Sequence, residues 1–257
     1  MPYTTSSGTR IYYEAHGQGP AIVLVHGSGG HHAAWWQQVP YLARWYTVVL
    51  PDLRGFGLSD PVEGGPDSLD FKDDLTAVLD DAGLDRAVFL GQSIGATPCM
   101  RLAMAAPARV AGLILAHSLG GINDAELNDM AAANRAEAVK LPVIDRLMSK
   151  SFQQANPEMT WLFREQGTFN HAKMQDLRNL NADGPSLEQV ASSGVPVHFL
   201  AGEADAVLRP ETVRRAHEKT ANSSLAIVPD APHSMYWERP ALFNAEVHKF
   251  LQKVYGQ

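Results

Sequence analysis

Three side chains of the sequence have the types and the chain order of a serine nucleophile with its base and acid. Ser93 stands in Gly-Gln-Ser-Ile-Gly at residues 91–95, a pattern typical of a sharp turn from a strand into a helix. A neutral hydroxyl needs a base, and His233 is a candidate in a loop near the end of the chain. The base needs an anionic partner, and Asp205 follows the preceding strand. The sequence therefore predicts a Ser–His–Asp triad.

A glycine-rich segment could stabilise the negative charge that such a nucleophile creates. Residues 26–30 read His-Gly-Ser-Gly-Gly and directly follow an apolar run. Glycines there leave backbone N–H groups free to face a developing oxyanion. A second N–H would come from Ile94, the residue after the nucleophile, at the start of a helix whose dipole favours negative charge. We therefore expect an oxyanion hole beside Ser93.

Strands and helices alternate along most of the chain, which positions these residues at one edge of a sheet. Strands are expected at residues 11–15, 21–25, 46–50, 87–90, 110–116, 195–201 and 224–228, and helices at 70–81, 97–106, 212–220 and 240–254. This alternation predicts an α/β fold with a mostly parallel sheet flanked by helices.

One stretch interrupts the alternation. Residues 122–184 contain helix-forming residues with breaks at proline and glycine and no strand pattern. We interpret this stretch as a helical cap inserted into a core domain made of residues 1–121 and 185–257.

Composition and charge exclude several classes of function. The 257 residues carry a net charge of −7 without a long basic cluster, which argues against a nucleic-acid partner. No apolar run is long enough for a membrane span, and no signal peptide is evident, so we expect no membrane partner and a cytoplasmic protein, a monomer or homodimer. The single cysteine, Cys99, fits a reducing compartment.

Taken together, the motifs make the chain resemble the α/β-hydrolase family from end to end. The matching pieces are His26-Gly27, residues 52–59 (Asp-Leu-Arg-Gly-Phe-Gly-Leu-Ser), residues 91–95, residues 202–205 (Gly-Glu-Ala-Asp) with Pro210, and Pro232-His233 with Trp237-Glu238.

The resemblance implies the α/β-hydrolase fold with a cap and a role for each site residue. Ser93 would be the nucleophile, His233 the base and Asp205 the residue that orients it. The backbone amides of Ser28 and Ile94 would form the oxyanion hole. No cofactor is implied. Some members place the acid after an earlier strand, which makes Asp124 the alternative to Asp205, although it comes late for that position.

The function that this resemblance favours is hydrolysis of small, fairly apolar carboxylic esters through an acyl-enzyme on Ser93. Cleavage of a carbon–carbon bond in vinylogous diketones, lactone hydrolysis and perhydrolysis use the same triad and stay open, because pocket shape selects among them. A ligand receptor that keeps the fold and triad is a rival of a different class.

Candidate pocket residues come from the segments around these motifs. They are Gly29, His31, Trp35, Trp161, Phe163 and Trp237. The adjacent pair His31-His32 could bind a metal only with a third ligand, and the sequence has no cysteine cluster or His-Glu-x-x-His motif, so we expect no metal site.

Overall fold

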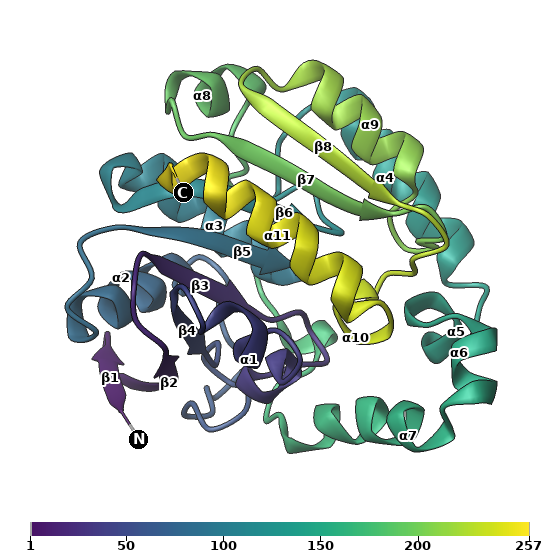
Figure 1. The fold of residues 1–257 in the computed structure, drawn as a ribbon, viewed down its shortest axis with the longest axis horizontal. Helices are drawn as coiled ribbons and strands as arrows, with labels where there is room; N and C mark the ends of the chain where they lie inside the picture. Colours follow the sequence, from purple (N-terminus) through teal and green to yellow (C-terminus); the bar gives the residue numbers. More distant parts are fainter. Residues whose placement is uncertain (1, 257) are drawn as a thin grey trace.

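Eight strands form one sheet in the computed structural model, which describes residues 2–256 (Figure 1). Their order across the sheet is β1-β2-β4-β3-β5-β6-β7-β8. The strands are β1 (Tyr3–Ser6), β2 (Thr9–His16), β3 (Ala21–Val25), β4 (Thr47–Pro51), β5 (Ala87–Gln92), β6 (Val110–Ala116), β7 (Val197–Gly202) and β8 (Ser223–Val228). Within the described residues only the β1–β2 and β2–β4 pairs are antiparallel and the other pairs are parallel, so the prediction of a mostly parallel sheet is confirmed.

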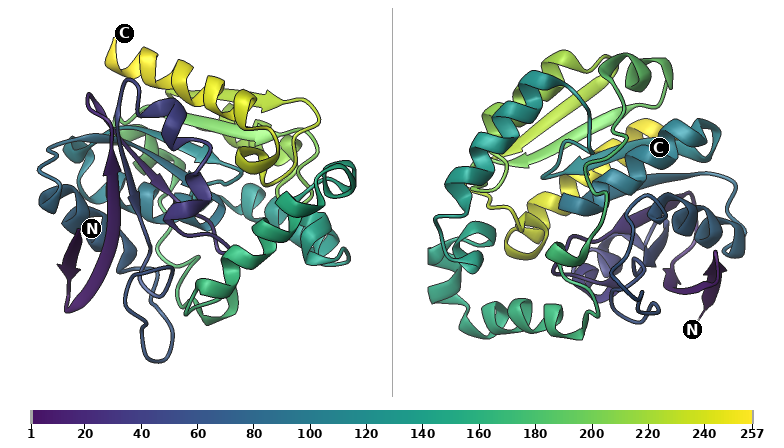
Figure 2. Two further views of the ribbon diagram at one scale, coloured as in Figure 1. Left: turned by 60° about the horizontal axis from the view of Figure 1, so that its bottom comes forward. Right: turned by 180° about the vertical axis from the view of Figure 1, so that it is seen from behind.

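Helices cover both faces of the sheet, as Figure 2 shows with α11 and α2 on opposite sides. The helices are α1 (Val39–Leu42), α2 (Phe71–Asp81), α3 (Ala96–Ala105), α4 (Ala125–Ala138), α5 (Val143–Leu147), α6 (Lys150–Ala155), α7 (Pro157–Gln166), α8 (Leu187–Ser192), α9 (Pro210–Lys219), α10 (Met235–Glu238) and α11 (Pro240–Tyr255). Among residues 2–256, no helix is both long enough and apolar enough to span a bilayer.

Two apolar clusters explain why the central strands are uninterrupted hydrophobic runs. One cluster joins side chains of α2, α3 and α9 to one face of the sheet, and includes Phe71, Cys99 and Val213. The other joins α1 and α11 to the opposite face, and includes Leu42 and Val247. Strands buried on both faces do not need polar residues at alternate positions, which is the pattern that the sequence shows.

The segment without a strand pattern contains α4 to α7 and no strand within the described residues. Helix α4 packs beside α9 of the sheet layer, where Glu126 pairs with Arg215. Helices α5, α6 and α7, here called the cap helices, lie together beyond one end of the sheet (Figure 1). That residues 122–184 form a separate cap domain stays a prediction.

Candidate active site

Ser93 lies on a sharp turn between β5 and α3, in the middle of the sheet. Its backbone φ is 53°, a left-handed conformation that is costly for a residue with a side chain. The turn needs glycine on both sides: a Cβ at Gly91 would lie 2.3 Å from the Ala96 Cα, and one at Gly95 would lie 2.5 Å from two backbone carbonyl oxygens. The sequence therefore folds here into a strained turn that carries the serine at the carboxyl end of the strand.

His233 and Asp205 form a buried hydrogen-bonded pair in the loops that follow β8 and β7. The His233 Nδ1 lies 2.9 Å from Asp205 Oδ2 and 3.1 Å from Oδ1. Asp205 Oδ1 also accepts hydrogen bonds from the backbone N–H groups of Val207 and Leu208, at 2.8 and 3.0 Å. Because Nδ1 is directed at the carboxylate, Nε2 on the opposite side of the ring is the nitrogen left for chemistry.

The environment keeps the Asp205 carboxylate ionised. Burial by itself would raise the pKa of Asp205, but attraction to His233 and hydrogen bonds from both His117 and His233 hold it well below its usual range. A negative charge therefore lies beside the His233 ring, where it would orient the ring and stabilise a proton added to it.

His117 is a site residue that the sequence reasoning missed. It directly follows β6, and its Nδ1 lies 2.9 Å from Asp205 Oδ2, on the same oxygen that His233 contacts. The sequence did contain a signal for it. His117 follows β6 and Asp205 follows β7, and neighbouring parallel strands bring the residues that follow them together at one edge of the sheet.

The glycine-rich segment after β3 is held by His26. Its Nε2 accepts a hydrogen bond from the Leu53 N–H at 3.1 Å, so its Nδ1–H donates to the Gly27 carbonyl at 2.8 Å. Burial lowers the pKa of His26 to about 4, which keeps this ring neutral. Within residues 2–256, the Ser28 N–H donates no hydrogen bond, as an amide reserved for an oxyanion requires.

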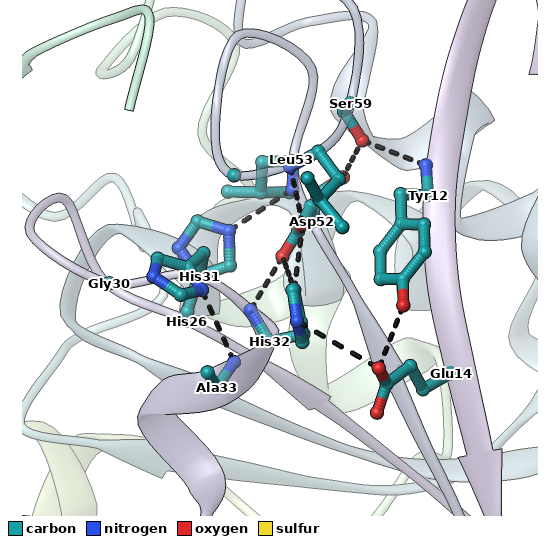
Figure 3. Close-up of polar contacts among 12 residues, drawn as sticks. Tyr12, Glu14, His26, Gly30, His31, His32, Ala33, Asp52, Leu53 and Ser59 are labelled. Atoms are coloured by element: carbon teal, nitrogen blue, oxygen red, sulfur yellow. Dashed lines mark hydrogen bonds and ion pairs between the residues drawn. The ribbon is translucent and has the colours of Figure 1, made fainter. Parts of the chain in front are cut away.

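A second polar network fixes the far end of this segment, as Figure 3 shows. The Asp52 carboxylate accepts hydrogen bonds from the backbone N–H and the ring Nδ1 of His32 and from the Leu58 N–H. His32 Nε2 lies 3.8 Å from Glu14 Oε1. His31, His32 and Asp52 have possible metal-ligand atoms within 4.8 Å of one another. In this structure the His32 Nδ1 and the Asp52 carboxylate oxygens are hydrogen-bonded to each other, and the carboxylate also accepts from backbone N–H groups.

This network makes the stability of the protein depend on pH near neutrality. Burial lowers the pKa of His32, but the hydrogen bond and charge of Asp52 outweigh it and raise that pKa above its usual value. A raised folded-state pKa gives stability that is complete below about pH 6.5 and lost as the pH rises through the folded-state value. His32→Asn should lower Tm by about 3 °C at pH 6 and much less at pH 9. Thermal unfolding of both proteins against pH tests this, and a pH-independent difference would contradict it.

Ser93 and His233 line one cavity of about 370 Å³ beside the glycine-rich segment. The segment contributes residues 27–30, and the cap helices and the loop before them contribute an apolar wall. The apolar wall consists of Pro142, Val143, Ile144, Leu147 and Phe163, joined by Tyr236 of α10, and Arg164 of α7 also lines the cavity. The arrangement brings together the predicted nucleophile, base, oxyanion segment and two predicted pocket residues, Gly29 and Phe163.

The other four predicted pocket residues do not line the cavity, although the Trp237 ring packs against that of Phe163 with centroids 5.4 Å apart. Trp35 and Trp237 are fully buried in the apolar cluster under α11, because their size fills the space between that helix and the sheet. Trp161 points outward from α7 with 64% of its surface exposed. His31 is buried against the edge of the Phe169 ring.

The alternative acid, Asp124, has a structural role. Its carboxylate accepts a hydrogen bond from the Leu127 N–H at the start of α4 and pairs with Lys219 at 2.7 Å. A side chain that caps one helix and pairs with another is not available to orient His233.

Comparisons with known proteins agree with the fold of this chain. The family model described as alpha/beta hydrolase fold matches residues 20–240. A proposed non-heme chloroperoxidase of Synechocystis sp. is 28% identical over 98% of this chain and 100% of that protein. The pimeloyl-[acyl-carrier protein] methyl ester esterase of Vibrio campbellii is 40% identical over 41% of this chain and 40% of that protein. The structure of an esterase from Thermogutta terrifontis superposes with a TM-score of 0.83 at 25% identity, covering 98% of each chain.

Proposed function

This chain belongs to the alpha/beta hydrolase fold family, and on that premise we propose that it hydrolyses small, apolar carboxylic esters through an acyl-enzyme on Ser93. The observation that carries the proposal is the cavity in which Ser93 and His233 meet an apolar wall and a free backbone amide. A volume of about 370 Å³ is near the lower end for ligand pockets, which range from about 300 to 1,000 Å³.

In the first half of the reaction, the Ser93 hydroxyl attacks the ester carbonyl while His233 Nε2 takes its proton. Asp205 accepts the Nδ1–H of the resulting imidazolium and stabilises its charge. The negative charge on the carbonyl oxygen is met by the Ser28 and Ile94 amides. Such preorganised donors are worth about 10²- to 10³-fold in kcat each.

The intermediate then collapses: its bond to the alcohol oxygen breaks, His233 gives its proton to the leaving alcohol, and the acyl group stays on Ser93. In the second half, His233 activates a water molecule by taking its proton. That water attacks the acyl-enzyme through a second oxyanion, the acid is released, and Ser93 regains its proton. The apolar wall from the cap helices contacts the parts of the substrate that do not react.

The size of the cavity predicts a preference for short acyl chains. In a p-nitrophenyl ester series from acetate to dodecanoate, kcat/KM should be highest at or below about hexanoate and at least ~10-fold lower at dodecanoate. An acyl chain longer than the cavity must displace wall side chains to bring its carbonyl to Ser93, and one methylene that does not fit is worth about 1–3 kcal/mol. Phe163→Ala should move the optimum to longer chains because Phe163 forms part of the wall.

Trp161→Ala is the matched control, since Trp161 lies on the same helix and points to solvent. It should leave the chain-length optimum in place. A wild type that hydrolyses no ester, although a fluorophosphonate labels Ser93, would contradict ester hydrolysis and leave carbon–carbon or lactone hydrolysis by the same triad.

A further inference from the structure

His117 is a second buried histidine on the triad carboxylate. Its side chain is inaccessible to solvent, and its Nδ1 shares Asp205 Oδ2 with His233. The rings of the two histidines meet edge to face with centroids 5.3 Å apart. The two oxygens of Asp205 are held differently. Oδ1 accepts from two backbone N–H groups and lies 3.1 Å from His233 Nδ1, whereas Oδ2 lies 2.9 Å from the Nδ1 atoms of both imidazoles.

The contacts fix the protonation state of His117. An ionised carboxylate only accepts hydrogen bonds, so the His117 Nδ1 carries a proton. Its Nε2 is buried without a partner among the described residues. A second proton there would create a buried, unpaired cationic donor. Burial, reinforced by repulsion from His233, lowers the pKa of His117 against the attraction of Asp205, which leaves the ring neutral. Asp205 and His233 are the titratable groups that act on it.

We propose that His117 is a positioning residue that holds Asp205 in place with a neutral hydrogen bond and limits how strongly this carboxylate retains the proton of His233. The proposal rests on the proposed function. A neutral donor satisfies a buried carboxylate without adding a cation that would repel the imidazolium formed at His233. It also withdraws negative charge from Oδ2, the carboxylate oxygen nearer to His233 Nδ1, and so weakens the attraction of the carboxylate for that ring.

Removal of this donor should change the pH profile of the enzyme. In His117→Leu, Oδ2 faces His233 alone, so the imidazolium is stabilised more and the acid limb of kcat/KM should move up by about 1 pH unit. The value of kcat on the plateau should fall about 10-fold with KM little changed, because Asp205 is held less firmly. His117→Asn should restore the acid limb, because its amide offers an N–H near the same place and asparagine tolerates the φ of 56° found here.

His198→Leu is the matched control. His198 is also a buried histidine with one hydrogen bond, between its ring Nδ1 and Ser224 Oγ at 2.9 Å, and its Nε2 has no hydrogen-bond partner within residues 2–256. Its replacement should lower Tm without moving the acid limb. If His117→Leu behaves in the same way, lowering Tm alone, the proposal is wrong and His117 only packs.

Two further measurements separate this proposal from the proposed function. The rate of Ser93 labelling by a fluorophosphonate can be followed against pH even if no ester is turned over, and it should show the same shift in His117→Leu. Proton NMR of the wild type should show a downfield imidazole signal from His117 that is lost in His117→Asn, while the signals of the other hydrogen-bonded histidines, such as His32 on Asp52, stay in place. A wild-type spectrum in which no such signal can be assigned to His117 would overturn the hydrogen bond, including in the event that His117→Leu does not fold.

Discussion

Ser93→Ala should give a folded protein whose kcat on the best p-nitrophenyl ester is lower by roughly 10⁴- to 10⁶-fold. The acyl-enzyme cannot form without the hydroxyl, and only the oxyanion amides and substrate binding are left to accelerate attack by water. The substitution removes one partly exposed atom from the cavity wall. Its Tm should therefore stay within a few degrees of the wild type, as measured by thermal unfolding.

Ser234→Ala provides the comparison, since this serine lines the same cavity. It should lower kcat by less than about 10-fold. If Ser93→Ala instead retained more than about a thousandth of the wild-type kcat after removal of contaminating esterases, Ser93 would not be the nucleophile.

The parts of the fold that the sequence predicts well are those with an unambiguous burial pattern. Strands β3 and β6 have no polar side chain over five and seven residues, and both appear at the expected bounds. Strand β1 was missed because Tyr3–Ser6 is short and mostly polar. The strand forms because it pairs with β2 across a turn at Ser7 and Gly8, both of which have positive φ. The four residues of the strand do not by themselves indicate that pairing.

The candidate triad was predictable because each of its members follows a strand, and parallel strands end at one edge of the sheet. The cavity wall was not predictable in the same way. Trp35 and Trp237 are large aromatic residues of the kind that often line pockets, yet they pack into the apolar cluster between α11 and the sheet. Ile144 and Leu147 line the cavity instead, although their segment shows only helix propensity. Which apolar residue faces a substrate depends on how the cap helices dock, and a local pattern does not contain that information.

The same reasoning explains why His117 escaped notice while Asp205 did not. A histidine after a strand is common. His117 can contact Asp205 because β6 and β7 are neighbours in the sheet, and the sequence of either strand alone does not show that they pair. The carboxylate that both histidines share is therefore the residue on which the site depends most after Ser93 itself.

Asp205→Asn is the second large effect expected, a loss of about 10⁴-fold in kcat near pH 7. The backbone N–H groups of Val207 and Leu208 point at the Oδ1 position and require an acceptor there. They fix the amide oxygen at that position and put the NH₂ at the Oδ2 position, facing His233. A donor there forces His233 to present an unprotonated Nδ1, so its proton moves to Nε2 and the base cannot accept from Ser93.

Steady-state kinetics of Asp205→Asn beside Asp230→Asn tests this reasoning, because Asp230 is an exposed residue in the loop that carries His233. The control should retain activity within a few-fold. A matching loss in both variants would indicate a disturbed loop, whereas retention of more than about 1% activity in Asp205→Asn would show that His233 keeps its working tautomer without the carboxylate. His117 should increase the loss of kcat in Asp205→Asn. The NH₂ group would face two imidazole nitrogens, and both of them donate to the carboxylate in the wild type. Both rings would have to change tautomer together.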